Sequence, residues 1–183
     1  MNYFVIFGLM IFLGMVLYID IIKIIINPTY WEGLKVVPVL LLANVFLGIY
    51  FNQSIWYKLS GQTRFGAYIA LVGAFFTIAL NLLFIPEYGF MACAYTTMFV
   101  YAFQMIASYL LGQKHYPINY NLRKFFLFLG SSLFLFWVSH WFDFTSGSIG
   151  KFIFNNFLIL LFIGLFFFIE NPLKKKDSLS INN

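Results

Sequence analysis

Residues 81–94 read NLLFIPEYGFMACA, and this stretch decides the fold because it joins two long apolar segments. Pro86 is expected to end the first segment, since proline donates no backbone hydrogen bond and biases Ile85 away from the helical region. Gly89 can adopt the backbone angles that a tight reversal needs. The small side chain of Ala92 then lets two helices approach closely. We therefore expect a sharp corner at which one helix leaves a membrane and the next returns to it.

The composition also indicates a membrane protein. Of the 183 residues, 62% are hydrophobic and 9% are charged, whereas a soluble domain carries about 25% charged residues. The apolar residues form blocks that are each long enough to cross a hydrocarbon core of about 30 Å. We expect an all-α lobe over residues 1–170 and a basic cytoplasmic tail over residues 171–183. Six transmembrane helices are predicted at about residues 3–25, 36–57, 65–85, 89–111, 125–142 and 152–169.

Charges in the predicted loops indicate how the chain is oriented. Alternation through six helices puts eight lysine and arginine residues on one side of the membrane and three on the other. Four of the six acidic residues fall on the side with three basic ones. By the positive-inside rule, both termini are expected in the cytoplasm and the corner at residues 81–94 outside. Basic cytoplasmic loops also explain the net charge of +5 without a nucleic-acid partner.

Polar residues within the predicted helices are the candidates for a substrate path. Asp20 and Lys23 are three residues apart on one helix face, so they form either an interfacial ion pair or a gate. Asn44, Gly48 and Asn52 recur every four residues and share one stripe. Such a stripe packs against other helices or lines a polar path.

Further small and polar residues follow the same logic in the next two helices. We assign Gly48 and the small residues of these helices to helix packing, and Gln104 to the cavity. The packing set in these two helices is Gly66, Gly73, Thr77 and Ala92, and the predicted corner comprises Asn81, Pro86 and Gly89. The last helix, residues 152–169, is apolar on all sides, so we expect it at the lipid-exposed periphery.

Enzyme chemistry finds no support in the sequence. There is no P-loop, no G-x-S-x-G and no H-E-x-x-H pattern, and no predicted span carries a pair of carboxylates. The two histidines are predicted on opposite sides of the membrane, and the single Cys93 allows neither a disulfide nor a cysteine metal site. We therefore expect no catalytic residues, no metal and no cofactor.

The corner and the segment before it resemble a known superfamily. The spacing of Asn81, Pro86, Gly89 and Ala92 resembles the helix–corner–helix signature of polysaccharide exporters of the MOP/MATE superfamily. The segment at residues 30–57, with YWEG, VP, LAN, GIYFN and WY in order, is similar to the C-terminal lobe of O-antigen and lipopolysaccharide flippases. The resemblance covers residues 1–125, and the last two helices fit only by hydropathy.

The resemblance implies a fold and a function. Such flippases have two lobes, with about twelve to fourteen spans in all, around a central cavity. The lobes rock so that the cavity opens to one side of the membrane at a time. They move undecaprenyl-pyrophosphate-linked oligosaccharide across the bacterial inner membrane, next to glycan polymerases and glycosyltransferases. This chain would supply the C-terminal portion of a longer protein. Basic cavity residues contact the pyrophosphate in that family, and no lysine or arginine lies in mid-span here.

Two other functions remain open at this stage. A MATE-type exporter of small cations needs an acidic residue deep in a span, and Asp20 is the candidate. A non-transporting membrane scaffold that organises glycan-assembly enzymes is the second. The residues that we expect along the substrate path are Asp20, Lys23, Asn44, Asn52 and Gln104.

Overall fold

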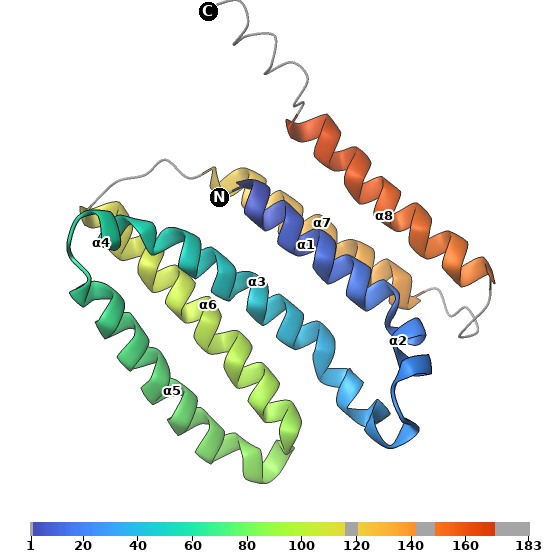
Figure 1. Ribbon diagram of the computed structural model, residues 1–183, viewed down its shortest axis with the longest axis horizontal. Coiled ribbons are helices and arrows are strands. Elements are labelled where there is room, and N and C mark those ends of the chain that lie inside the picture. The colour runs from blue at the N-terminus through green and yellow to red at the C-terminus, as the bar shows by residue number, and fades with distance from the viewer. Residues whose placement is uncertain (1, 116–120, 142–148, 171–183) are drawn as a thin grey trace, which may run out of the picture.

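The computed structural model describes residues 2–115, 121–141 and 149–170, and their regular structure is entirely helical (Figure 1). This confirms the predicted all-α class. The predicted basic tail at residues 171–183 lies outside the described residues. The elements in chain order are α1 (Asn2–Leu17), α2 (Ile19–Ile25), the 3-10 helix η1 (Pro28–Val36), α3 (Val37–Gln53), α4 (Ile55–Leu59), α5 (Arg64–Tyr88), α6 (Phe90–His115), α7 (Leu122–Trp141) and α8 (Ile149–Glu170).

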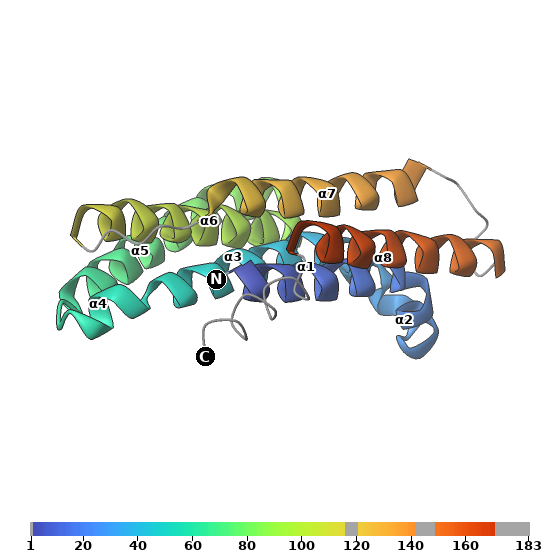
Figure 2. The same ribbon diagram turned by 90° about the horizontal axis from the view of Figure 1, so that it is seen from above.

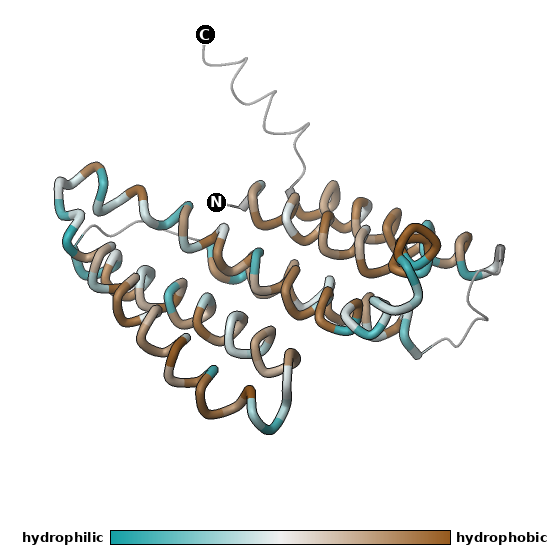
Figure 3. Tube along the Cα trace, turned by 60° about the horizontal axis from the view of Figure 1, so that its bottom comes forward, coloured by the Kyte–Doolittle hydropathy of each residue, from teal (hydrophilic) through white to brown (hydrophobic). Residues whose placement is uncertain are grey.

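The described helices are long and apolar enough for a multi-pass membrane protein. Five candidate spans are continuous, and α1 with α2 makes a sixth if that bent pair counts as one. Seen from above, the long helices lie along one common direction (Figure 2). Hydrophobic residues fill the middle of the bundle and hydrophilic ones gather at its ends (Figure 3). This pattern is what a hydrocarbon slab requires of the helices that cross it.

The corner between α5 and α6 differs from the expected one at Pro86. Helix α5 continues through Pro86 to Tyr88, so the prediction that proline ends this helix was wrong. Pro86 cannot donate a hydrogen bond to the Leu82 carbonyl, and α5 ends two residues after it. The reversal is made at Gly89 alone, with φ of 59° and its N–H bonded to the Ile85 carbonyl at 2.8 Å. Asn81 and Pro86 therefore belong to a helix and not to the corner.

The first predicted span is broken. Helices α1 and α2 meet at an angle of 62° next to Tyr18, where we expected one straight helix over residues 3–25. No proline occurs in this part of the chain. The break therefore does not have proline as its cause.

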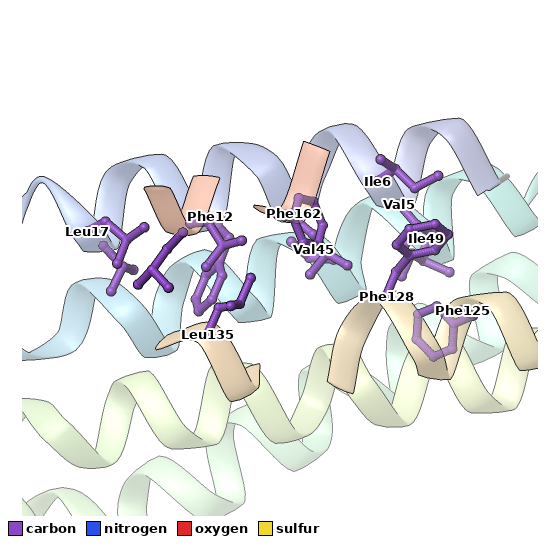
Figure 4. Packing of buried hydrophobic residues seen from close by; sticks show 14 residues of the cluster. Val5, Ile6, Phe12, Leu17, Val45, Ile49, Phe125, Phe128, Leu135 and Phe162 are labelled. Carbon is purple, nitrogen blue, oxygen red and sulfur yellow. The ribbon is translucent and has the colours of Figure 1, made fainter. Parts of the chain in front are cut away.

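One hydrophobic core joins α1, α3, α7 and α8. Its most buried side chains include Phe12 of α1, Phe128 of α7 and Phe162 of α8, each no more than 2% exposed. Figure 4 shows these side chains with Val45 and Ile49 of α3 in the space between the four helices. Helix α8 lies at the edge of the bundle. It does not face lipid on all sides, because Leu158 and Phe162 are buried in this core.

Glycines allow close contacts among the other helices. A Cβ on Gly73 of α5 would lie 2.1 Å from Gln104 Nε2 of α6, so the buried Gln104 side chain occupies the space that a larger residue would fill. A Cβ on Gly48 would likewise meet the Phe4 ring of α1. Thr77 bonds to the Gly73 carbonyl within α5 at 2.9 Å, and Ala92 of α6 is buried.

Gly66 is a position where we expect a substitution to be costly. A Cβ there would lie 2.7 and 2.9 Å from two ring atoms of Tyr57, which is only 6% exposed and has little room to move. We predict that Gly66→Ala lowers the free energy of unfolding by about 1–2 kcal/mol, as overpacking outweighs the better helix propensity of alanine. Unfolding in mixed detergent micelles measures it.

Gly130 of α7 provides the matched control, because nothing lies within 4 Å of the Cβ that alanine would add. Gly130→Ala should be neutral or stabilising by up to about 1 kcal/mol. If Gly66→Ala proves as stable as Gly130→Ala, the close contact between α4 and α5 is not present.

Candidate functional site

The break between α1 and α2 leaves the Leu17 carbonyl without its helical partner. In a continuous helix the Leu17 carbonyl would accept from the N–H of Ile21. Here the Ile21 N–H donates to the Tyr18 carbonyl at 3.0 Å instead. Leu17 is 4% exposed, and a buried carbonyl without a partner costs free energy. The break therefore requires a hydrogen-bond donor from elsewhere in the chain.

Helix α8 supplies that donor. Asn155, which is 3% exposed, donates from Nδ2 to the Leu17 carbonyl at 2.6 Å. Its Oδ1 accepts a hydrogen bond from the Ser139 hydroxyl of α7 at 3.3 Å. A single amide thus links α8 to α7 and to the end of α1, and both ends of the Asn155 side chain are satisfied.

One turn before Asn155, Lys151 makes a second link from α8 to the break. Its ammonium group donates to Asp20 Oδ2. Lys23 Nζ bonds to the other oxygen, Oδ1, at 3.0 Å. Asp20 is only 18% exposed at its side chain, so two lysines share one carboxylate in a partly dry environment. The sequence predicted the Asp20–Lys23 pair but not the third member.

The 3-10 helix η1 closes the far end of α2. Trp31 donates from Nε1 to the carbonyls of Ile26 at 3.0 Å and Lys23 at 3.2 Å. These carbonyls lie in the last turn of α2 and beyond it, where no helical N–H remains to pair with them. Asn27 begins η1 with a side chain that accepts from the Thr29 N–H at 3.1 Å. The loop is thereby fixed beside the broken span.

A pocket of about 560 Å³ opens next to this cluster. Its size is within the range of small-molecule and cofactor sites. Its walls combine apolar side chains with charged and polar ones. The lining residues are Val16, Leu17, Ile19, Lys23, Trp31, Glu32, Leu34, Lys35, Pro38, Phe136, Ser139, His140 and Lys151.

The charge of the pocket favours anions. Three lysines face two carboxylates, because Lys35 is 3.8 Å from Glu32 and the other two lysines share Asp20. His140 adds a group that can donate a hydrogen bond. The arrangement therefore suits an amphipathic ligand with an anionic group near the lysines and an apolar part against the end of α1.

The structure brings together only two of the five residues expected along a substrate path. Asp20 and Lys23 meet at the broken span. Asn44 is exposed in the middle of α3, where its Nδ2 bonds to the Leu40 carbonyl of its own helix at 2.9 Å. Asn52 is half-buried near the other end of α3, and Gln104 packs against α5. The described residues therefore form no common cavity from all five.

Sequence reasoning missed the polar face of the last helix. Lys151 and Asn155 are four residues apart and share a face, and this spacing was the available signal. We expected residues 152–169 to be apolar on all sides, and Asn155 is an exception.

Asn81, which we expected at the corner, is half-buried in α5. Its Oδ1 has no hydrogen-bond partner among the described residues.

Among the described residues, no group of three or more histidine, cysteine, aspartate or glutamate side chains could hold a metal ion. Comparison with models of protein families, with curated proteins and with solved structures finds no match. The geometry of the broken span is therefore the basis for a functional proposal.

Asn155 and Asn156 form a matched pair for testing the site. We predict that Asn155→Leu lowers the free energy of unfolding by about 1–3 kcal/mol, because it leaves the buried Leu17 carbonyl unpaired. Among the described residues, Asn156 bonds only to the Phe152 carbonyl of its own helix, so Asn156→Leu should change stability by no more than about 0.5 kcal/mol. Unfolding in mixed micelles measures both. Equal effects would contradict the role of Asn155.

The Asp20–Lys151 pair is tested by a double-mutant cycle. Lys151→Met should cost about 1–3 kcal/mol of stability, between the values for exposed and buried pairs. In an Asp20→Asn background the same substitution should cost much less, since the partner charge is gone.

Lys35→Met is the control for this cycle. Lys35 and Glu32 are both mostly exposed, at 67% and 73%, so the loss should be under about 0.5 kcal/mol. An additive cycle would show that Lys151 does not stabilise the break through Asp20.

Proposed function

We propose that this chain is the C-terminal lobe of a bacterial exporter that flips undecaprenyl-pyrophosphate-linked oligosaccharide across the inner membrane. The observation that carries the proposal is the pocket at the broken span, which is lined by three lysines and by apolar side chains. Half-helix ends near substrate are a recurring feature of transporters built from repeats. The MOP/MATE resemblance of residues 30–57 and of the α5–α6 hairpin points to the same function.

The pocket matches the chemistry of such a substrate in three parts. The pyrophosphate needs cations, and Lys23, Lys35 and Lys151 supply them. The polyprenyl chain needs apolar surface, which the end of α1 offers. The first sugar needs an aromatic face or hydrogen-bond donors, and Trp31 provides the ring. No bond of the substrate is made or broken.

The state of Asp20 favours an anionic substrate over a small cation. A cation exporter would need this carboxylate free to receive its substrate or a coupling proton. Lys23 and Lys151 already occupy both oxygens of Asp20. A substrate anion can instead compete with Asp20 for its lysines, which couples binding to the contact between α2 and α8.

The proposal includes an orientation. Both termini face the cytoplasm under the positive-inside rule, so the pocket and Gly89 face the periplasm and the pocket is a release site. Lipids surround the lobe, and a glycan polymerase or glycosyltransferase is the expected protein neighbour.

Complementation of a flippase-deficient strain tests the proposal. The complete reading frame that contains this chain should restore surface polysaccharide. Lys35→Met should reduce export by about tenfold at equal protein level, the effect of one lost charge-assisted contact of about 1.4 kcal/mol. This variant is suitable because we expect Lys35 to contribute little to stability.

Lys58→Met serves as the control, since Lys58 is exposed at the other end of the bundle. It should export like the wild type. Correct insertion without restored polysaccharide would contradict the proposal, as would equal export by the two lysine variants. Reduced ethidium accumulation in the same cells would instead favour the cation exporter.

A further inference from the structure

A second cavity lies at the end of the bundle opposite the broken span. It measures about 150 Å³ and is formed where α3, α6 and α7 meet. Its walls are apolar apart from an amide and a phenol. The residues that line it include Ile49, Gln53, Ile106, Leu122, Phe125 and Phe126.

Gln53 is the unusual residue of this cavity. It is 4% exposed, and its Oε1 has no hydrogen-bond partner among the described residues. A buried amide carbonyl normally accepts a hydrogen bond, because leaving it unpaired is costly. The position is also shallow: six residues separate it from the end of α4, or about 9 Å of helix. The site therefore calls for a donor at the depth of lipid head groups.

Basic residues lie at the same end of the bundle as this cavity. Arg123 and Lys124 belong to the same turn of α7 as the lining residues Leu122 and Phe125. Lys58 and Lys114 lie exposed at the ends of α4 and α6. In contrast, three acidic residues lie toward the opposite end: Asp20 in α2, Glu32 in η1 and Glu87 in the last turn of α5. This end of the bundle therefore attracts negative charge.

We propose that this cavity binds an anionic glycerophospholipid of the phosphatidylglycerol class. The phosphate lies against Arg123, a hydroxyl of the head-group glycerol donates to Gln53 Oε1, and one acyl chain leaves across Ile106 and Phe126. The small volume holds only the glycerol region, so the chains stay mostly in the bilayer. Basic pockets between membrane helices commonly bind anionic head groups.

The chemistry selects this lipid over its neighbours. Phosphatidylcholine has no hydrogen-bond donor for Gln53 and no net charge to meet Arg123. Phosphatidylethanolamine has a donor but no net charge. Inorganic phosphate has the charge but cannot use the apolar walls. The site is independent of the pocket at α1 and α2 and does not rest on the transport proposal.

Native mass spectrometry of the purified chain tests the assignment, with equal amounts of phosphatidylglycerol, phosphatidylethanolamine and phosphatidylcholine added. We expect phosphatidylglycerol adducts to dominate. Arg123→Ala and Gln53→Leu should each reduce them about fivefold or more, as expected for loss of a charged or a buried polar contact. Arg64→Ala, which removes an exposed charge at the same end, should have no such effect.

Ile106→Trp provides a variant that does not depend on buried packing, because Ile106 is 53% exposed. Its larger ring should block the cavity and remove the adducts while the circular dichroism spectrum stays unchanged. Equal retention of the three lipids would overturn the proposal. Unchanged phosphatidylglycerol binding in Arg123→Ala or Ile106→Trp would also overturn it, and so would equal competition by inorganic phosphate.

Discussion

A backbone carbonyl buried in apolar surroundings must have a hydrogen-bond donor, and the Leu17 carbonyl makes this the governing constraint of the structure. Asn155 stabilises the break between α1 and α2 because it donates a hydrogen bond to that carbonyl. The same contact places α8 against α1 and brings Lys151 to Asp20. The pocket beside the break exists because α2, η1, α7 and α8 are held apart and fixed there.

The polar cluster at the break has one part that fixes the geometry and another part that a bound anion can alter. Asn155 is satisfied at both ends, so it holds the break in one geometry. Asp20 is different, because it is shared between Lys23 and Lys151 and any incoming anion competes for the same cations. An anionic substrate would therefore loosen the link between α2 and α8 while leaving the Leu17 carbonyl paired. This separates the part that holds the fold from the part that can respond to a ligand.

Local chemistry accounts for much of the fold, and distant contacts account for the site. The spans follow from uninterrupted apolar runs, and the reversal at Gly89 follows from its positive φ. The expected stop at Pro86 was wrong by two residues, since α5 continues through the proline to Tyr88 and reverses at Gly89. The break at Leu17 has no local signal, because its partner Asn155 is 138 residues away. Asp20 and Lys23 were predicted as a pair, but Lys151 could be placed beside them only by the packing of α8.

Accessibility of Ser139 to a water-borne reagent tests the central claim that the broken span forms a wet pocket open to the periplasm. Ser139→Cys, in a Cys93→Ser background, should react with a membrane-impermeant thiol reagent added outside right-side-out vesicles. Ser131→Cys is the control on the same helix, two turns deeper, and should not react. Labelling of Ser139→Cys only from the cytoplasmic side would contradict the orientation. Protection of this cysteine from both sides would contradict the pocket itself.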